Sequence, residues 1–408
     1  MINQKKSRVF YGYVIVTAGL LAGIFIIGQG TVIGVFFKPI TQELGWSRAM
    51  TSVAVSISAL VTGISGVFMG RLTDRYGPHL VLIIAALAAG LGNVLLSRVS
   101  ALWHFYLFYG FLVGIAMGAA DIPIVTTVSK WFVRRRGMMV GITKAGAGIG
   151  IILFPILANL FIDASGWRNA YLYLGGIVLI GILLAAFPLK RDPAQMKLLP
   201  DGDTVEPTTE MTAQRSNYSL KDALSSRQFW TFTGVWFIFF SCVQVILTHL
   251  VNHATDLGVS ATIGASIVSV IGGFSILGRL TLASLSDRIG PKSAYLIALA
   301  LLALAMLWVQ FSREAWMFYV FATIYGTAHG ACFALLAPML SKLFGLNSLG
   351  TIMGFTMLFG TLGGLVSPVA AGWIFDFTDT YDLAFIIMLA LAALGILLML
   401  SLKPMPNR

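Results

Sequence analysis

The chain repeats itself at a fixed offset of 213 residues. The pentapeptide Asp74-Arg75-Tyr76-Gly77-Pro78 returns as Asp287-Arg288-Ile289-Gly290-Pro291. The same offset relates further pairs: Glu43 with Asp256, Gly45 with Gly258, Ser47 with Ser260, Gly137 with Gly350, Gly141 with Gly354, Pro155 with Pro368, and Asp163 with Asp376. A long and nearly ungapped repeat predicts two copies of one structural unit in a single chain.

The composition places both copies in a membrane. Hydrophobic residues make up 58% of the chain, charged residues only 11%, and the mean hydropathy is +0.88. Soluble domains carry about a quarter charged residues, so most of this chain is expected to lie in lipid. Many secondary transporters consist of two such membrane-embedded repeats, and we therefore expect a substrate path between the halves.

Twelve apolar stretches are long enough to cross a hydrocarbon core of about 30 Å as helices. They run approximately over residues 12–38, 47–70, 79–99, 103–128, 138–163, 169–188, 227–252, 260–283, 292–311, 315–341, 350–374 and 381–402. The expected fold is an all-α membrane protein with twelve transmembrane helices in two pseudo-symmetric six-helix bundles. The bundles would span residues 1–189 and 227–408, joined by a cytoplasmic linker at 190–226.

Basic residues predict the orientation. If both termini face the cytoplasm, cytoplasmic segments hold about 20 of the Lys and Arg residues and the outward loops about five, as the positive-inside rule requires. Cytoplasmic clusters would include Lys5, Lys6, Arg8, the run Arg134-Arg135-Arg136, and Lys190-Arg191. The net charge of +11 then reflects topology and not a nucleic-acid partner. We expect a multi-pass, monomeric protein of the plasma (inner) membrane.

No motif indicates an enzyme, a cofactor or a metal site. The sequence has no Walker loop, no HExxH and no dinucleotide turn in a strand–helix context. Gly146 to Gly150 lie in an apolar stretch, where glycines favour close helix packing. Cys242 and Cys332 fall within predicted helices as core residues. In the linker, Ser219–Arg227 is predicted to form a short amphipathic helix at the membrane surface.

The loop between the second and third predicted helices resembles a family signature. Gly70-Arg71-Leu72-Thr73-Asp74-Arg75-Tyr76-Gly77-Pro78 resembles the signature loop of the major facilitator superfamily, with Pro78 and His79 in place of the usual basic residues. Asp74 can pair with Arg75 or accept hydrogen bonds from the start of a neighbouring helix. We expect Asp74, Arg75, Asp287 and Arg288 to latch the halves in one state; the alternative is a tight turn with solvated charges.

Within that superfamily, the chain resembles the monocarboxylate transporter branch and the related oxalate/formate-type antiporters. The resemblance is carried by Val35-Phe36-Phe37-Lys38 leading to Leu44-Gly45-Trp46-Ser47, by Ser129-Lys130-Trp131-Phe132, and by Gly278-Arg279-Leu280. It implies a small carboxylate as substrate, whereas the departures below mean that neither proton–lactate symport nor oxalate exchange follows from the resemblance. Vertebrate relatives carry a lysine where this chain has Thr31 and an acid where it has Ser275. The oxalate-type antiporters carry a helix-eleven lysine that is absent here.

Arg279 is the first candidate for substrate binding. It precedes Asp287 by eight residues, which places it about 12 Å inside the membrane at 1.5 Å per residue. An arginine at that depth is normally aimed at a cavity or a partner. Its planar guanidinium matches a carboxylate with two parallel hydrogen bonds. The resemblance implies the same role; a structural ion pair or a snorkelling side chain is the alternative.

Asp121 and Lys144 are the other charges in the middle of predicted spans. Asp121 can carry a proton whose uptake depends on whether an anion is bound to Arg279. Alternatively, it can form a permanent ion pair with Arg279 or Lys144. Lys144 has small neighbours (Gly141, Ala145, Gly148), so its side chain is expected between helices, where it contacts substrate or balances Asp121. The 213-residue repeat copies none of these charges: Arg279 maps onto Gly66, Lys144 onto Met357, and Asp121 close to Phe333.

Four uncharged or weakly basic side chains complete the predicted site: His249, His329, Ser275 and Gln29. Histidine can titrate near neutral pH, but one within a membrane helix can equally be a hydrogen-bonded core residue. The expected function is proton-coupled transport of a monocarboxylate by alternating access. A dicarboxylate or anion exchanger and an efflux pump for amphipathic compounds are the alternatives; a non-transporting sensor of the same fold would need soluble signalling regions that the linker does not supply.

Overall fold

The computed structural model describes residues 10–46, 48–203 and 218–403, and this part of the chain consists of helices and connections without strands. The first half contains α1 (Tyr11–Thr31), α2 (Ile33–Leu44), α3 (Arg48–Tyr76), α4 (Pro78–Leu96), α5 (Leu102–Phe105), the π-helical segment η1 (Tyr106–Val113), α6 (Gly114–Gly118), α7 (Ile122–Trp131) and α8 (Arg136–Ala186). The second half contains α11 (Arg227–Asp256), α12 (Ala261–Ile289), α13 (Pro291–Val309), α14 (Ala315–Phe344), α15 (Leu349–Thr378) and α16 (Asp382–Ser401).

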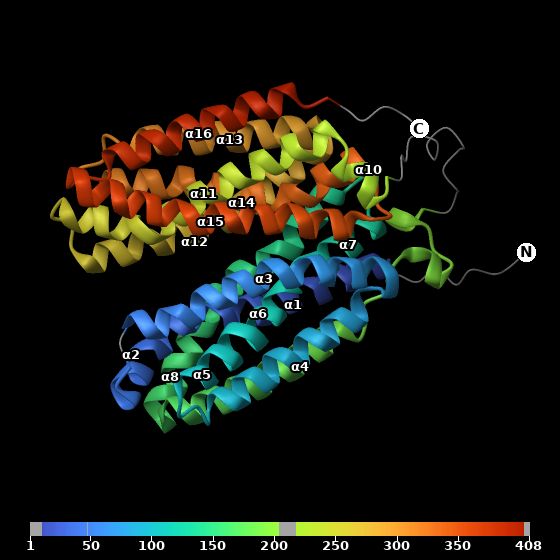
Figure 1. Cartoon of the computed structure of the whole chain (residues 1–408). Coiled ribbons are helices and arrows are strands. Elements are labelled where there is room, and N and C mark those ends of the chain that lie inside the picture. The colour runs from blue at the N-terminus through green and yellow to red at the C-terminus, as the bar shows by residue number, and fades with distance from the viewer. Residues whose placement is uncertain (1–9, 47, 204–217, 404–408) are drawn as a thin grey trace, which may run out of the picture.

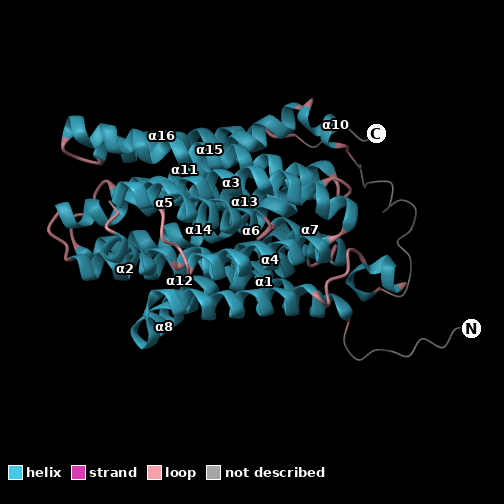
Figure 2. Ribbon diagram, turned by 60° about the horizontal axis from the view of Figure 1, so that its bottom comes forward, coloured by secondary structure: helices cyan, strands magenta, loops and turns pink. Residues whose placement is uncertain are grey.

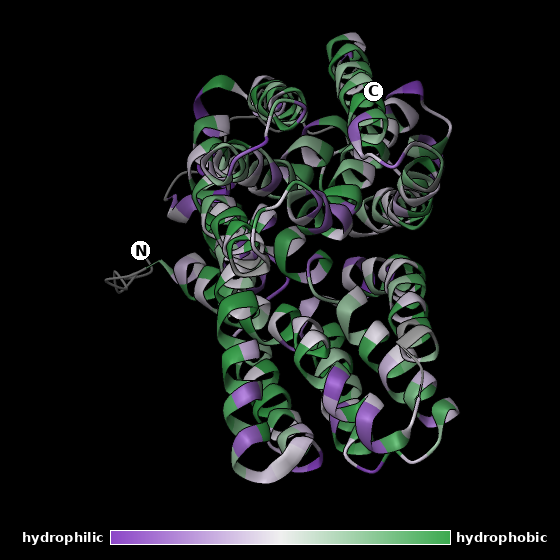
Figure 3. Cartoon of the chain, turned by 90° about the vertical axis from the view of Figure 1, so that its left-hand side faces the viewer, coloured by the Kyte–Doolittle hydropathy of each residue, from purple (hydrophilic) through white to green (hydrophobic). Residues whose placement is uncertain are grey.

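Eleven helical segments of the described residues are long and apolar enough to span a membrane, and α8 is long enough for two crossings. Its 51 residues would extend about 76 Å as one rod, more than twice the thickness of the hydrocarbon core. Gly166 interrupts it with a φ of 80°, a left-handed conformation that favours glycine. Figure 3 shows hydrophobic residues covering most of both bundles, as lipid contact requires.

The two halves form separate bundles whose helices run in roughly the same direction (Figures 1 and 2). Both described ends of the chain lie at the same end of the molecule, which we call the terminal side. The bundles are closest there and diverge towards the other end, the distal side (Figure 1). An all-helical fold of two six-helix bundles is therefore confirmed.

Glycines allow the bundles to touch on the terminal side. Helix α3 packs against α15, and α8 packs against α12. A methyl group on Gly70 would overlap the backbone carbonyl of Gly350, and a methyl group on Gly137 would overlap that of Ala283. The 213-residue repeat relates α3 to α12 and α8 to α15, so the two contacts are pseudo-symmetric copies.

The connection between the halves contains η2 (Pro193–Met196), η3 (Pro200–Gly202) and α10 (Leu220–Leu224). The predicted helix Ser219–Arg227 is shorter than expected, because α10 begins with a Ser219–Asp222 capping box and α11 starts anew behind Ser226. Residues 204–217 of the predicted linker lie outside the described residues. Helix α8 ends before residue 190 and α11 begins after residue 226; the domain boundaries themselves stay a prediction.

Candidate functional site

The fourth crossing is broken at the depth of its only carboxylate. Helix α6 ends at Gly118, α7 starts at Ile122, and Ala119 to Asp121 leave the helical path. Pro123 explains the break, since its ring has no N–H and clashes with the carbonyl of the residue four positions earlier, Ala119. The span predicted over 103–128 is present as Leu102–Trp131, but its helix is interrupted at this point. Transporters commonly use such discontinuous helices at binding sites.

Asp121 uses its carboxylate for an ion pair and not for capping the following helix. It occupies the N-cap position of α7 but makes no side-chain capping bond. Its Oδ2 lies 2.6 Å from Nζ of Lys144 on α8. The lysine side chain is 5% exposed and the aspartate 18%. The lysine thus points between helices, as its small neighbours predicted, and a void of about 10 Å³ adjoins the pair.

Arg279 connects the two halves at the same site. Its Nη1 donates a 3.0 Å hydrogen bond to the backbone carbonyl of Lys144, which lies in the other bundle. The residue is only 5% exposed, and its Nε has no hydrogen-bond partner among the described residues. Gly141 permits this approach, because a methyl group there would overlap the carbonyl of Arg279. A buried guanidinium with a spare donor is suited to an anion.

An aromatic and hydroxylated wall from the second half faces the charges. Nδ1 of His329 is 3.0 Å from Oγ of Ser275, the residue one turn before Arg279. The ring of Phe333 lies 5.0 Å from His329 and 5.5 Å from Nζ of Lys144. Five of the predicted residues therefore meet in one region: Asp121, Lys144, Arg279, Ser275 and His329.

His249 and Gln29 belong to other networks. His249 is hydrogen-bonded by both ring nitrogens, to the hydroxyl of Tyr381 at 3.2 Å and the carbonyl of Pro368 at 2.9 Å. Gln29 accepts a 2.8 Å hydrogen bond from Asn93, and its own Nε2 has no partner in the described part of the chain. His249 is a buried, hydrogen-bonded residue of the second half, and Gln29 is a buried residue of the first half.

Sequence reasoning missed three partners of these residues: Asn93, Tyr381 and Phe333. Asn93 was visible as a lone amide in an apolar span, a signal that could have found it. Phe333 lies next to the repeat position of Asp121, so the pseudo-symmetry pointed to its depth. Tyr381 carried no comparable signal, because it lies in a short connection between two helices.

On the terminal side, two aspartates cap helices of the opposite half. Asp74 accepts hydrogen bonds from the backbone N–H groups of Gly350 and Thr351, at 3.1 and 2.8 Å, and from the Thr351 hydroxyl at 2.8 Å. Asp287 accepts from the N–H groups of Gly137 and Met138, at 2.7 and 2.9 Å. These residues are 213-residue repeats of one another, so the two caps are pseudo-symmetric. Carboxylates at helix N-termini are favourable.

The neighbouring arginines do not take part in the capping bonds. The Arg75 guanidinium lies over the ring of Tyr76, 5.2 Å from its centroid, and Arg288 is exposed at the end of α12. Two partners were predicted for Asp74, namely Arg75 and the start of a neighbouring helix. The structure shows hydrogen bonds to the start of a helix, α15. Within the described ranges, no group of three or more His, Cys, Asp or Glu side chains is arranged to hold a metal ion.

A family model described as Major Facilitator Superfamily matches residues 19–283 and 252–408. The chain belongs to the major facilitator superfamily. This confirms the family predicted from the Gly70–Pro78 loop, and the protein is a transporter relative and not an enzyme. Among solved structures, a proton:xylose symporter, XylE, superposes with a TM-score of 0.79 at 14% identity, covering 96% of both chains. FucP in the outward conformation gives 0.72 at 13% identity over 96% of this chain and all of that one.

Curated relatives of this superfamily member are monocarboxylate transporters. Monocarboxylate transporter 12 of Rattus norvegicus is 28% identical over 92% of this chain and 82% of its own length. Monocarboxylate transporter 4 of the same organism is 25% identical over 87% and 75%. Monocarboxylate transporter 13 is 24% identical over 96% and 89%. The resemblance predicted from the Phe36-Phe37 and Gly278-Arg279 motifs is confirmed at this level.

Proposed function

We propose that this superfamily member carries a small monocarboxylate, of the lactate or pyruvate type, together with a proton across the plasma membrane, as a monomer with cytoplasmic termini. The observation that carries the proposal is Arg279. Its guanidinium is buried, retains an unpartnered donor, and meets the Asp121–Lys144 pair of the other half. The monocarboxylate transporter relatives agree with this substrate class.

The charge of the site favours a monoanion. Arg279 and Lys144 supply two positive charges and Asp121 one negative charge, which leaves a single positive charge when Asp121 is ionised. A bound monocarboxylate neutralises that charge, and a proton that joins Asp121 with it restores the single positive charge of the empty site. Substrate and proton together therefore leave the charge of the site unchanged, whereas substrate without the proton would change it.

A dicarboxylate or anion exchanger is the second candidate, and protonation of Asp121 is what would favour it. Without the negative charge on Asp121, the two cations of the site match a dianion. The two candidates therefore differ in the charge of the substrate that is bound while Asp121 is protonated.

Alternating access would follow from the two-bundle arrangement. The Asp74 and Asp287 caps hold the terminal side closed, while the bundles diverge on the distal side (Figure 1). We propose that a carboxylate entering from the distal side binds Arg279 and groups of the first half, including Lys144. Breaking the two caps would then let the bundles rock and release the substrate on the terminal side.

The test is uptake of radiolabelled lactate into proteoliposomes by the Arg279→Lys variant. Lysine keeps the charge but loses the planar pair of donors, so initial uptake should fall at least tenfold. Arg227→Lys is the matched control, since Arg227 is exposed at the start of α11. Near-normal uptake by Arg279→Lys would remove Arg279 from the site. Uptake of radiolabelled succinate without uptake of radiolabelled lactate would favour the exchanger.

A further inference from the structure

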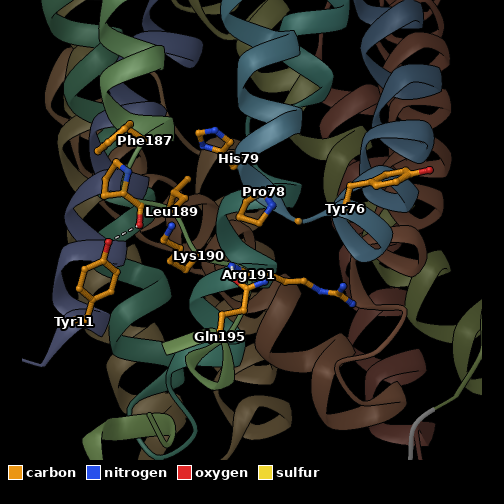
Figure 4. Close-up of a pocket in the computed structure, with 11 residues that line it drawn as sticks. Tyr11, Tyr76, Pro78, His79, Phe187, Leu189, Lys190, Arg191 and Gln195 are labelled. Atoms are coloured by element: carbon orange, nitrogen blue, oxygen red, sulfur yellow. Dashed lines mark hydrogen bonds between the residues drawn. The ribbon is translucent and has the colours of Figure 1, made fainter. Parts of the chain in front are cut away.

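A groove of about 490 Å³ lies on the terminal side of the first bundle, away from the substrate site (Figure 4). It is bordered by the start of α1, the α3–α4 turn, and the chain that leaves α8. Its main side chains are Tyr11, Tyr76, His79, Phe187, Lys190 and Arg191. None of these residues contributes to the transport mechanism proposed above.

Three side chains from three helices fix one wall of the groove. The Tyr11 hydroxyl donates to the carbonyl of Pro188 at 2.9 Å, and Nε1 of Trp131 donates to that of Lys190 at 3.0 Å. Nδ1 of His79 lies 2.9 Å from the carbonyl of Ala186. The backbone that carries Lys190 and Arg191 is therefore held in place before any ligand arrives.

The groove is basic. Lys190 is exposed, and its ammonium makes no hydrogen bond or ion pair within the described residues. Arg191 donates from Nη1 to the carbonyl of Arg75 at 3.3 Å, and its Nε lies 4.0 Å from the carboxylate of Asp192. Asp192 thus offsets part of one charge, while the lysine charge remains available. Two basic residues that are adjacent in the chain thus border the groove, and basic side chains bind phosphate groups.

An apolar stripe leads out of the groove along α8. Ile180, Leu184 and Phe187 are spaced by four and three residues, so they share one face of the helix. They are 59%, 68% and 80% exposed. On a membrane-spanning helix this face meets lipid, and its last residue borders the groove. A ligand with a phosphate and hydrocarbon chains would fit both features at once.

We propose that this groove binds the phosphate headgroup of an anionic phospholipid from the leaflet on the terminal side. Lys190 and Arg191 contact the phosphate, Tyr11 and Tyr76 flank it at the level where aromatic side chains favour the interface, and the acyl chains follow the α8 stripe. Free phosphate carries the same kind of charge but has no acyl chains that could contact the apolar stripe on α8. The site rests on the fold alone and is independent of the transported substrate.

The experiment compares lipid binding by two charge-matched double variants of the whole protein in detergent. Lys190→Gln/Arg191→Gln removes the groove cations, and Lys221→Gln/Arg227→Gln removes two exposed cations outside it. Native mass spectrometry measures binding of phosphatidylglycerol, phosphatidylcholine and inorganic phosphate. Lys190→Gln alone serves as a second variant, since its ammonium supports no contact within the described residues.

We expect phosphatidylglycerol to bind the groove variant about tenfold more weakly than it binds the wild type. Its affinity for the control variant should equal its affinity for the wild type. Phosphatidylcholine should bind weakly to all four proteins. Equal phosphatidylglycerol affinity in the groove and control variants would overturn the proposal. Groove-dependent binding of inorganic phosphate with no preference for phosphatidylglycerol would also overturn it, because the site would then be one for a free anion.

Discussion

Asp121 has two possible tasks, and its contacts make them separable. It neutralises Lys144 at 2.6 Å, and it can carry the coupled proton. Removing one partner of a buried pair leaves an uncompensated charge, which destabilises proteins by about 3–5 kcal/mol. A transport defect in a variant of Asp121 must therefore be distinguished from a loss of stability.

We predict that Asp121→Asn abolishes the pH dependence of net lactate transport while leaving lactate exchange active. The asparagine can neither release nor accept the proton that net symport requires. Proteoliposome uptake at two external pH values and counterflow at symmetric pH are the measurements. Proton uptake that still accompanies lactate in this variant would show that another group carries the proton.

Stability gives the control for that variant. Asp121→Asn should lower the thermal unfolding temperature, and Asp121→Asn/Lys144→Met should recover most of the loss, because no charge then remains unpaired. If the double variant unfolds at a lower temperature than the single one, Lys144 has a further structural partner.

The three charges of the site were predictable because each is expensive inside a membrane and therefore conspicuous. Asp121, Lys144 and Arg279 are the acidic and strongly basic residues that interrupt the middle of apolar spans. Their pairing was not predictable: either cation could have taken Asp121, and the choice depends on the helix crossing. The hydrogen-bonded state of His249 was likewise left open, since its partner Tyr381 is distant in the sequence.

Among the elements, the broken fourth crossing has the clearest functional meaning. The break between α6 and α7 turns Asp121 towards Lys144 on α8. Hydropathy predicted one continuous span here, because it records apolar length and carries no information on backbone conformation. Pro123 was the signal in the sequence, and its position one turn after Ala119 locates the break.

We predict that Pro123→Ala lowers lactate uptake at least tenfold while the protein stays folded. Alanine permits the helix to continue through residues 119–123, which would rotate Asp121 away from Lys144. Hydrogen–deuterium exchange should slow across these residues. Pro291→Ala is the control, since Pro291 opens α13 remote from the charges. Unchanged exchange and uptake in Pro123→Ala would show that proline does not maintain the break.

For the whole molecule, the two aspartate caps join the halves on the terminal side. The repeat predicted two equivalent halves, and the caps are equivalent as well. Asp74 and Asp287 each accept hydrogen bonds from the first backbone N–H groups of a helix in the other half. The sequence did not predict whether the distal or the terminal side is open, because both states are built from the same helices.

We predict that Asp74→Asn and Asp287→Asn shift the protein towards the state that is open on the terminal side, by similar amounts. A helix cap contributes about 0.5–2 kcal/mol, which corresponds to a change of roughly 2- to 30-fold in the equilibrium. Spin labels at Ser100→Cys and Asp256→Cys, one on each half at the distal side, should move closer together. The native Cys242 and Cys332 are buried and would stay unlabelled.

Glu314→Gln is the control for the caps. It removes an exposed carboxylate on the distal side, whose hydrogen bond to Trp316 is local. The label distance should be unchanged. If only one aspartate variant shifts the distance, the two halves do not share the closing contact equally.

If a carboxylate binds Arg279 as proposed, the hydrogen bond from Arg279 to the carbonyl of Lys144 makes ligand affinity and conformation mutually dependent. A carboxylate that takes this donor removes a bond that joins the bundles. By thermodynamic reciprocity, if ligand binding changes the equilibrium constant between the two states by some factor, the ligand's dissociation constants for those two states differ by the same factor. A variant that merely biases the protein to one side would therefore change the dissociation constant without altering a single contact to the substrate.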